Sequence, residues 1–318
     1  MIKAYAAPKT LSEAIRYFAH KEHAFAFVVQ LRWPNGVACP HCQSDQVSFL
    51  STRHIFKCKE CRKQFSVKVG TIFEDSALGL DKWLPALWML ANCKNGISSY
   101  ELHRALGVTQ KTAWFMLHRI RLAMQTKTFQ KFSGHVEADE TFVGGKLMFM
   151  HQGRRARNAR GPQPNKTPVM GLLQRGPKGK SRVHTIMTKS LKKPQMQAQV
   201  REHVEPGSNL FTDAFLSYRG LGADYIHDVI DHTVSYAEGQ IHTNGLENFW
   251  SLLKRGIKGT YTSVDPFHLF RYVSEQVFRF NERSGNDGDR FRSVLGDVVG
   301  KRLTYAELIG ADLNPATT

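Results

Sequence analysis

The chain has 318 residues, of which 42% are hydrophobic and 11% aromatic, so it is long enough for two or three folded modules and is not disordered throughout. No stretch is apolar enough to span a membrane, and the first residues lack the apolar core of a signal peptide; we therefore expect a cytoplasmic protein without a membrane partner. The net charge is +17, and residues 141–201 contain fourteen Lys and Arg but no Asp or Glu, which leaves 30 basic against 27 acidic residues elsewhere. Such a one-signed segment suits a polyanion such as nucleic acid, whereas a generally basic protein would spread its charge evenly.

Residues 1–34 are predicted to form a helical segment. Thr10 can cap it, and apolar residues recur at helical spacing as far as Leu31. The sequence Trp33-Pro34-Asn35-Gly36 then predicts a turn.

Residues 35–75 contain two C-x2-C pairs, Cys39 with Cys42 and Cys58 with Cys61, separated by fifteen residues. Four thiolates at this spacing are typical of a tetrahedral zinc site, and alternating stretches at 47–50, 55–57 and 64–69 predict the strands of a zinc ribbon. Disulfides are the alternative, which a cytoplasmic protein disfavours. Because four thiolates leave no open coordination position, we expect the zinc to be structural.

Residues 76–130 are predicted to be mainly helical. Asp81 can cap a first helix, with Pro85 in its first turn. Ser98 can open a second helix, and Thr109 a third after a turn at Gly107. This is the outline of a helix-turn-helix, although an ordinary helical hairpin has the same pattern. In a DNA-binding motif the residues that touch base edges would be Gln110, Lys111 and Thr112.

From Gly134 onward, strands alternate with helices. The strand 135–143 carries three acids, and alternation places Glu137 and Asp139 on one face and Glu140 on the other. An acid on the core face needs a metal, a cation or another special partner. Further strands are predicted at 169–173, 182–187, 209–213 and 225–230, with a helix at 193–204. This order fits an α/β fold with an RNase H-like sheet, spanning residues 131–285.

A basic loop containing Gly and Pro, residues 153–162, follows the acidic strand. Its charge makes it a candidate for contacts with DNA phosphates through Arg154, Arg155, Arg157 and Arg160.

The helix that begins near Asn244 has an apolar stripe and a polar side that carries Glu247, Ser251, Lys254 and Lys258. A capping pair would explain two of its polar residues, with Asn244 as N-cap and Glu247 at the third position. It would not explain Asp213 at a strand end. We therefore predict that Asp139, Asp213 and Glu247 form a three-carboxylate site for two Mg²⁺ or Mn²⁺ ions, which suits in-line phosphoryl displacement. The neighbouring candidates for DNA contact are Lys254, Arg255 and Lys258.

Three motifs resemble a known family: residues 139–146 (DETFVGGK), 212–214 (TDA) and 242–256 (HTNGLENFWSLLKRG). They resemble the catalytic domain of one group of bacterial insertion-sequence transposases, DDE-type enzymes with an N-terminal zinc ribbon that are also similar to Merlin transposons. The resemblance extends over nearly the whole chain. It implies a retroviral integrase-type RNase H-like domain, metal-dependent cleavage of element ends, and strand transfer by the 3′-OH. It also implies double-stranded DNA as partner, a dimer or larger assembly on DNA, and a nucleoid-associated place in the bacterial cytoplasm.

By position, Asp139 and Asp213 match the first two acids of the family motif, and Lys254 matches its basic residue. The third position can be Glu247 or Asn244. We favour Glu247 because a carboxylate offsets cation charge, with Asn244 as a supporting or substrate contact. Glu282 stands where the family often has Arg, and residues 286–318 are predicted to be a C-terminal extension.

Two other functions fit parts of the sequence. One is a DNA-binding regulator, or degenerate transposase, that keeps the zinc ribbon and helix-turn-helix without catalysis. The other is an RNase H-like nuclease or resolvase without strand transfer. The presence of all three acids and Lys254 favours an enzyme over the regulator.

Overall fold

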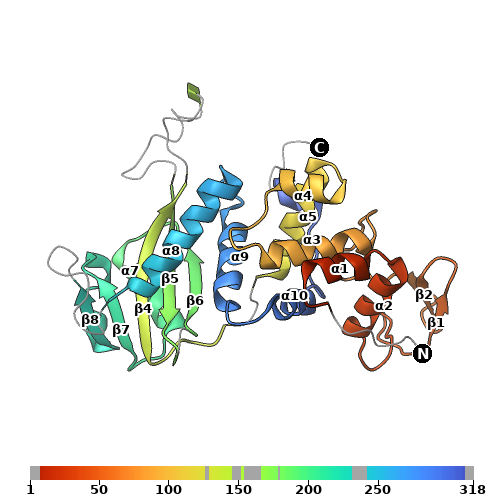
Figure 1. Cartoon of the computed structure of the whole chain (residues 1–318). Coiled ribbons are helices and arrows are strands. Elements are labelled where there is room, and N and C mark those ends of the chain that lie inside the picture. Colours follow the sequence, from red (N-terminus) through yellow and green to blue (C-terminus); the bar gives the residue numbers. More distant parts are fainter. Residues whose placement is uncertain are drawn as a thin grey trace. The chain divides into compact units, whose positions relative to one another are not determined.

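The computed structural model describes residues 8–125, 129–144, 152–153, 166–177, 180–230 and 242–311. The chain divides into two compact units, one of residues 1–124 and 285–318 and the other of residues 125–284 (Figure 1). The second unit is therefore an insertion in the sequence of the first. The predicted N-terminal segment, zinc ribbon, helix-turn-helix and C-terminal extension fall almost entirely within the first unit. Their separate boundaries stay predictions. Within the described ranges, no helix is long and apolar enough to cross a membrane.

The N-terminal helical segment consists of two helices, α1 (Leu11–Phe18) and α2 (Lys21–Arg32). Thr10 caps α1 as predicted, since its side chain accepts the N–H of Glu13 at 3.2 Å. The chain leaves helical geometry at His20, which is extended, so the single predicted segment is divided there.

The ribbon contains an antiparallel sheet in the order β1 (Val47–Leu50), β2 (Ile55–Cys58) and β3 (Gln64–Phe65). The prediction that the last strand reaches residue 69 is wrong. The chain turns directly after Phe65, and Arg32 of α2 donates to the carbonyl of Val67 at 2.7 Å. One face of this sheet packs its aromatic rings against α2.

Helix α3 (Leu80–Asn92) lies at the centre of the first unit and contacts several other helices. Its N-cap is Gly79, so the prediction that Asp81 caps it is wrong. The Asp81 side chain folds back over Gly79, where a Cβ atom would lie 2.1 Å from the Asp81 carboxylate. Pro85 consequently falls inside the helix rather than in its first turn.

Helices α4 (Ser99–Leu106) and α5 (Gln110–Ala123) form the predicted helix-turn-helix outline. Ser98 and Glu101 form a reciprocal capping box, and Thr109 caps α5. Gly107 ends α4 with φ +64°, a left-handed conformation that glycine adopts without strain. Ser98 and Thr109 thus open the two helices as predicted.

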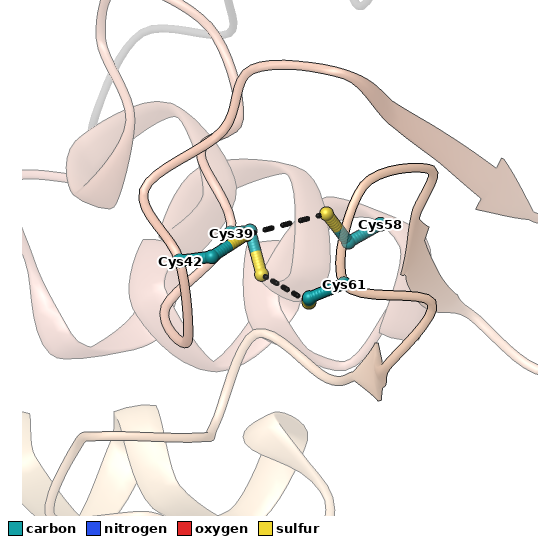
Figure 2. A group of neighbouring side chains, drawn as sticks. All are labelled: Cys39, Cys42, Cys58 and Cys61. Atoms are coloured by element: carbon teal, nitrogen blue, oxygen red, sulfur yellow. Dashed lines mark hydrogen bonds between the residues drawn. The ribbon is translucent and has the colours of Figure 1, made fainter.

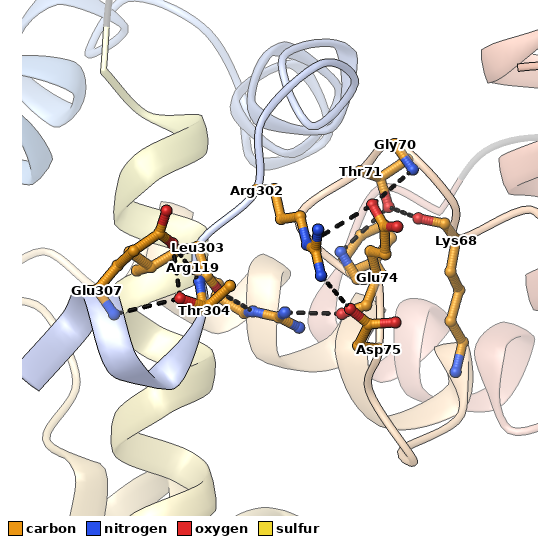
Figure 3. Close-up of polar contacts among 11 residues, drawn as sticks. Lys68, Gly70, Thr71, Glu74, Asp75, Arg119, Arg302, Leu303, Thr304 and Glu307 are labelled. Carbon is orange, nitrogen blue, oxygen red and sulfur yellow. Dashed lines mark hydrogen bonds and ion pairs between the residues drawn. The ribbon is translucent and has the colours of Figure 1, made fainter. Parts of the chain in front are cut away.

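The C-terminal residues complete the first unit through α10 (Asp287–Gly296) and α11 (Tyr305–Ile309). Phe291 of α10 is 1% exposed, and its ring centroid lies 5.0 Å from Trp88 and 5.7 Å from Phe18. Figure 3 shows Arg119 of α5 between two carbonyls; it donates to Leu303 at 3.0 Å and to Glu74 at 2.7 Å. These residues therefore contribute to the core of the first unit.

The described part of the second unit contains a five-stranded mixed sheet in the order β6-β5-β4-β7-β8. The strands are β4 (His135–Val143), β5 (Thr167–Gln174), β6 (Arg182–Met187), β7 (Asn209–Asp213) and β8 (Ile226–Ile230). Strand β5 pairs antiparallel with both β4 and β6, whereas β7 pairs parallel with β4, and β8 pairs parallel with β7. The predicted α/β class is confirmed.

Helices cover both faces of this sheet (Figure 1). On one face, α7 (Lys193–His203) packs against alternate residues of β4, β5 and β7. On the other lie α8 (Asn244–Gly256), a π-helical turn (Ile257–Tyr261) and α9 (Leu269–Asn281). The predicted apolar stripe is buried: Leu246, Phe249, Trp250 and Leu253 on α8, and Ile257 at the start of the π-helical turn.

Candidate active site

Asp139 and Asp213 lie on adjacent parallel strands and on the same face of the sheet. The register of β4 and β7 pairs Ala138 with Thr212, so the next residue on each strand is an aspartate. Parallel neighbours in register point their side chains to the same side, and such strands lie about 4.8 Å apart. Asp213 is the last residue of β7, and its Oδ1 accepts the N–H of Phe215 at 3.1 Å.

Helix α8 is attached to β4 at two points. Glu137 Oε2 accepts the N–H of Leu246 at 3.0 Å, and Asp139 Oδ2 accepts the indole N–H of Trp250 at 2.9 Å. Four residues of helix advance about 6.0 Å and two residues of strand about 6.7 Å, so the two pairs of contacts match in spacing. Both acids thus face α8, as alternation predicts, and the charge of Glu247 on this helix acts on Asp139.

Glu137 has a structural partner of opposite charge. Its side chain is 1% exposed, and its Oε1 accepts Arg175 Nε at 2.7 Å and lies 3.5 Å from His242 Nδ1. Arg175 also donates to the carbonyl of His242 at 2.5 Å. Glu137 therefore fixes the start of α8 against the sheet.

Two glycines allow α8 to approach the sheet closely. Gly171 of β5 lies opposite Asp139 in the antiparallel register. A Cβ atom there would be 2.6 Å from the Trp250 ring and 2.8 Å from Leu246. At Gly245, a Cβ atom would be 2.8 Å from the Glu137 carboxylate. A side chain at either position would force the helix away from the acids.

Burial and mutual repulsion disfavour the ionised forms of the acids. Burial raises the pKa of Asp139 to about 6, and the charges of Asp213 and Glu247 act in the same direction. Hydrogen bonds from Trp250 and from the N–H of Glu140 act in the opposite direction. Divalent cations are the partners that such a group of carboxylates would accept.

Glu140 is a fourth acid of this cluster, which sequence reasoning did not include among the site residues. It points to the α7 face, as alternation predicts, where its Oε2 accepts the hydroxyl of Tyr218 at 3.0 Å. Burial raises the pKa of Glu140 to about 7, and Asp213 and then Asp139 add to the rise. The only signal in the sequence was its place next to Asp139.

The carboxylates do not converge on one point. Among the described residues, the cysteines are the group of three or more potential ligands whose donor atoms all lie within 4.8 Å of one another. The carboxylates of Asp139, Asp213 and Glu247 do not form such a group.

The third acidic position of the family motif lies at the start of α8. The capping interpretation of Asn244 is wrong, because Thr243 is the N-cap and Asn244 is the first helical residue. Thr243 Oγ1 donates to Glu247 Oε1 at 3.3 Å. Asn244 and Glu247 are both exposed, and the negative charge that reaches Asp139 from this helix comes from Glu247. The assignment of Glu247 over Asn244 stays a prediction.

The structure describes only some of the basic residues that are predicted to contact DNA. Lys254 is exposed on α8 and lies close enough to Asp139 for the carboxylate to raise its pKa, although burial lowers that pKa overall. The charges of Lys166 and Lys258 also lower it, which adds Lys166 to the predicted set. Arg255 and Lys258 are exposed. The remaining candidates lie outside the described residues: Arg154, Arg155, Arg157 and Arg160.

The four cysteines of the ribbon surround one point, as Figure 2 shows. The Sγ atoms of Cys39 and Cys61 are 3.6 Å apart, as are those of Cys42 and Cys58. Four sulfurs at 2.3 Å from a tetrahedral zinc ion would be about 3.8 Å from one another. All four thiols are free of disulfides, so the cysteines are positioned to bind a metal ion.

The side chains predicted to read DNA at the start of α5 each have a contact within the protein. Gln110 Nε2 donates to Ser99 Oγ at 2.8 Å, and the Lys111 amine lies 4.6 Å above the centre of the Tyr305 ring. The hydroxyls of Thr112 and Thr109 are 2.7 Å apart. Their role in DNA binding stays a prediction.

Comparison with known proteins shows to which family the chain belongs. The profile of the ISXO2-like transposase domain matches residues 131–281, and that of the transposase zinc-ribbon domain matches residues 20–64. A protein of the transposable element ISH50 from Halobacterium salinarum is 27% identical over 283 residues, which cover 83% of this chain and 94% of the relative. A transposase-like protein from Haemophilus influenzae is 31% identical over 103 residues, covering 32% of this chain and 83% of the relative. The chain belongs to this family of insertion-sequence transposases.

The two family matches coincide with the two sites. The transposase domain includes all the strands that carry the acids and helix α8, and the zinc-ribbon match includes all four cysteines. Helices α1, α3 to α5, α10 and α11 lie outside both matches.

Proposed function

We propose that this transposase cleaves the ends of its insertion sequence and joins them to target DNA, in a metal-dependent reaction of the DDE type. The observation that carries the proposal is that Asp139 and Asp213 lie in register on adjacent strands, next to a helix whose Glu247 and Lys254 both interact electrostatically with Asp139. The strand order supports an RNase H-like fold: a three-stranded antiparallel meander followed by two strands parallel to its first member.

In this proposal Asp139, Asp213 and Glu247 hold two Mg²⁺ or Mn²⁺ ions. Ions bound there would supply positive charge that stabilises both the attacking and the leaving oxygen of an in-line displacement at phosphorus. In the first step a water oxygen bonds to phosphorus and the bond to the 3′ oxygen breaks, which frees a 3′-OH. In the second step that 3′-OH attacks a phosphate of target DNA and displaces another 3′ oxygen. Lys254 holds the phosphate beside the acids, and Asn244 supports the substrate.

The first unit serves DNA binding in this proposal. A structural zinc ion held by four thiolates stabilises the ribbon, and the sulfur distances fit it. The start of α5, with Gln110, Lys111 and Thr112, contacts base edges. The basic loop and residues Arg255 and Lys258 contact phosphates. Synapsis of two element ends then requires a dimer or a larger assembly on DNA.

The proposal is tested with purified protein and a plasmid that carries the element ends, in Mn²⁺ and in EDTA. We expect nicking only in Mn²⁺, and joining of a pre-cleaved 3′-OH end to a second plasmid. Nicking without joining would identify a nuclease or resolvase. No nicking in either condition would favour the non-catalytic regulator.

Variants assign the roles. Asp139→Asn, Asp213→Asn and Glu247→Gln should each abolish nicking and leave DNA binding intact. The control is Asp224→Asn, since Asp224 forms an exposed ion pair with Arg201 at 2.8 Å and should not affect nicking. If Glu247→Gln nicks like the unaltered protein and Asn244→Ala does not, Asn244 supplies the third position.

A further inference from the structure

Trp250 both packs in the apolar core and donates a hydrogen bond to Asp139. It belongs to the apolar stripe of α8 and is 4% exposed, packed with Phe249 and Leu253 against the sheet. Its indole nitrogen nevertheless donates to Asp139 Oδ2 at 2.9 Å. A buried indole N–H usually has a hydrogen-bond acceptor. Here the acceptor is the central carboxylate of the site.

Both oxygens of the Asp139 carboxylate are held by the protein. Oδ1 accepts the N–H of Glu140 at 2.8 Å, and Oδ2 accepts that of Trp250. Two donors on two different elements fix the plane of the carboxylate. Each carboxylate oxygen has a second lone pair, so each can still bind an ion. An ion that binds this carboxylate need not first restrict its rotation.

Gly171 makes this contact possible. It lies opposite Asp139 on β5, and the Trp250 ring occupies the space above it. Because a Cβ atom at this position would lie 2.6 Å and 2.9 Å from two ring carbons, any other residue would push the indole off the sheet. Asp139, Gly171 and Trp250 therefore form one unit across β4, β5 and α8.

We propose that Trp250 is a positioning residue for metal binding: its N–H fixes the orientation of the Asp139 carboxylate, and Gly171 provides the space for it. This inference rests on the proposed function, because it assumes that Asp139 binds a divalent ion. Partners that orient a metal ligand usually change metal affinity by about 10- to 100-fold when they are removed.

The test measures Mn²⁺ affinity of the zinc-loaded, full-length protein without DNA, from the electron paramagnetic resonance signal of free Mn²⁺. We expect Trp250→Phe, which keeps a ring but has no N–H, to bind Mn²⁺ about 10- to 100-fold more weakly. Gly171→Ala should shift affinity in the same direction. Phe280→Leu is the matched control, since Phe280 is a buried ring of the same cluster on α9, and this variant should retain the affinity of the unaltered protein.

A second replacement separates the hydrogen bond from packing. Substitution of Trp250 by 3-benzothienylalanine keeps the shape of the indole and replaces its N–H by sulfur, so it should weaken Mn²⁺ binding as Trp250→Phe does. Retention of full affinity by this variant would overturn the inference. Asp139→Asn provides the reference: if it binds Mn²⁺ as tightly as the unaltered protein, the proposed metal site itself is wrong. If Asp139→Asn loses the ion and the two Trp250 variants do not, only the role of Trp250 is wrong.

Discussion

At the scale of single residues, the ionised carboxylates of the site repel one another unless a cation is present. Burial is the main reason that the pKa of Asp139 is raised from 3.8 to about 6. A carboxyl with a raised pKa holds its proton more tightly in the folded protein than in the unfolded chain. Its ionisation therefore costs stability, and the cost grows as the pH rises from about 4 to about 6. The difference between the two pKa values corresponds to about 3 kcal/mol.

Asp139→Asn should remove this pH dependence. In EDTA, we expect the variant to gain stability relative to the unaltered protein as the pH rises from about 4 to about 7, by about 1–3 kcal/mol. Urea denaturation at several pH values measures this difference. The two proteins are compared with each other because burial also lowers the pKa of His184 to about 4. This histidine makes the stability of both proteins rise with pH over the same range, and the comparison cancels its effect. A stability difference that is constant over this range would contradict the account.

At the scale of secondary-structure elements, the site depends on the attachment of α8 to β4. Removing one partner of a buried ion pair leaves the other charge uncompensated, which typically costs about 3–5 kcal/mol. We expect Glu137→Gln to destabilise the second unit by about 3 kcal/mol and to lower Mn²⁺-dependent nicking, because Arg175 and the start of α8 lose their anchor. Urea denaturation and the nicking assay measure the two effects.

The control is Arg201→Gln, which removes an exposed ion pair of similar length. Exposed pairs contribute about 0–1 kcal/mol, so this variant should remain close to the unaltered protein. If both variants lose the same stability, Glu137 does not anchor the helix.

The basic loop of residues 153–162 gives a separate prediction at this scale, made from its sequence alone. Replacing Arg154, Arg155 and Arg157 by Ala should weaken binding to all DNA sequences alike, because phosphate contacts carry no sequence information. The slope of log K against log salt should become shallower by about 0.9 for each DNA phosphate that the variant no longer neutralises. An unchanged slope, measured by fluorescence anisotropy, would show that this loop does not bind the DNA backbone.

Periodicity predicted the elements of the second unit well, because strand alternation and the stripe of α8 are local patterns. It placed Glu137 and Asp139 on one face, and their contacts with Leu246 and Trp250 confirm this. It gave Trp250 no role beyond burial. A side chain in an apolar stripe can also donate a hydrogen bond, and only the register of three elements shows that Asp139 receives it. The misplaced cap of α3 has a local cause, since Gly79 supplies the extended conformation that Asp81 was expected to adopt.

At the scale of the whole molecule, the chain leaves the first unit after residue 124 and returns to it at residue 285. No sequence pattern predicted this return, because an amphipathic helix such as α10 does not specify its partner. Its Phe291 packs against rings of α1, α2 and α3. Helices α1, α2 and α3 therefore share a core with residues that follow the transposase domain in sequence.

Phe291→Ala should destabilise the first unit by about 3–5 kcal/mol, the usual cost of removing a buried ring. Phe267→Ala is the matched control, since Phe267 is 43% exposed and should have little effect. Limited proteolysis under increasing urea measures both, and early cleavage between residues 8 and 124 is expected for Phe291→Ala alone. Equal resistance of the two variants would show that α10 is not needed for the first unit.

The central claim is that Asp139, Asp213 and Glu247 share a pair of divalent ions. It is tested most directly by anomalous diffraction from crystals of the protein grown with Mn²⁺ and an element-end DNA. We predict two anomalous peaks at the carboxylates of Asp139, Asp213 and Glu247. Ordered acids and DNA with no anomalous peak within coordination distance of Asp139 would contradict it.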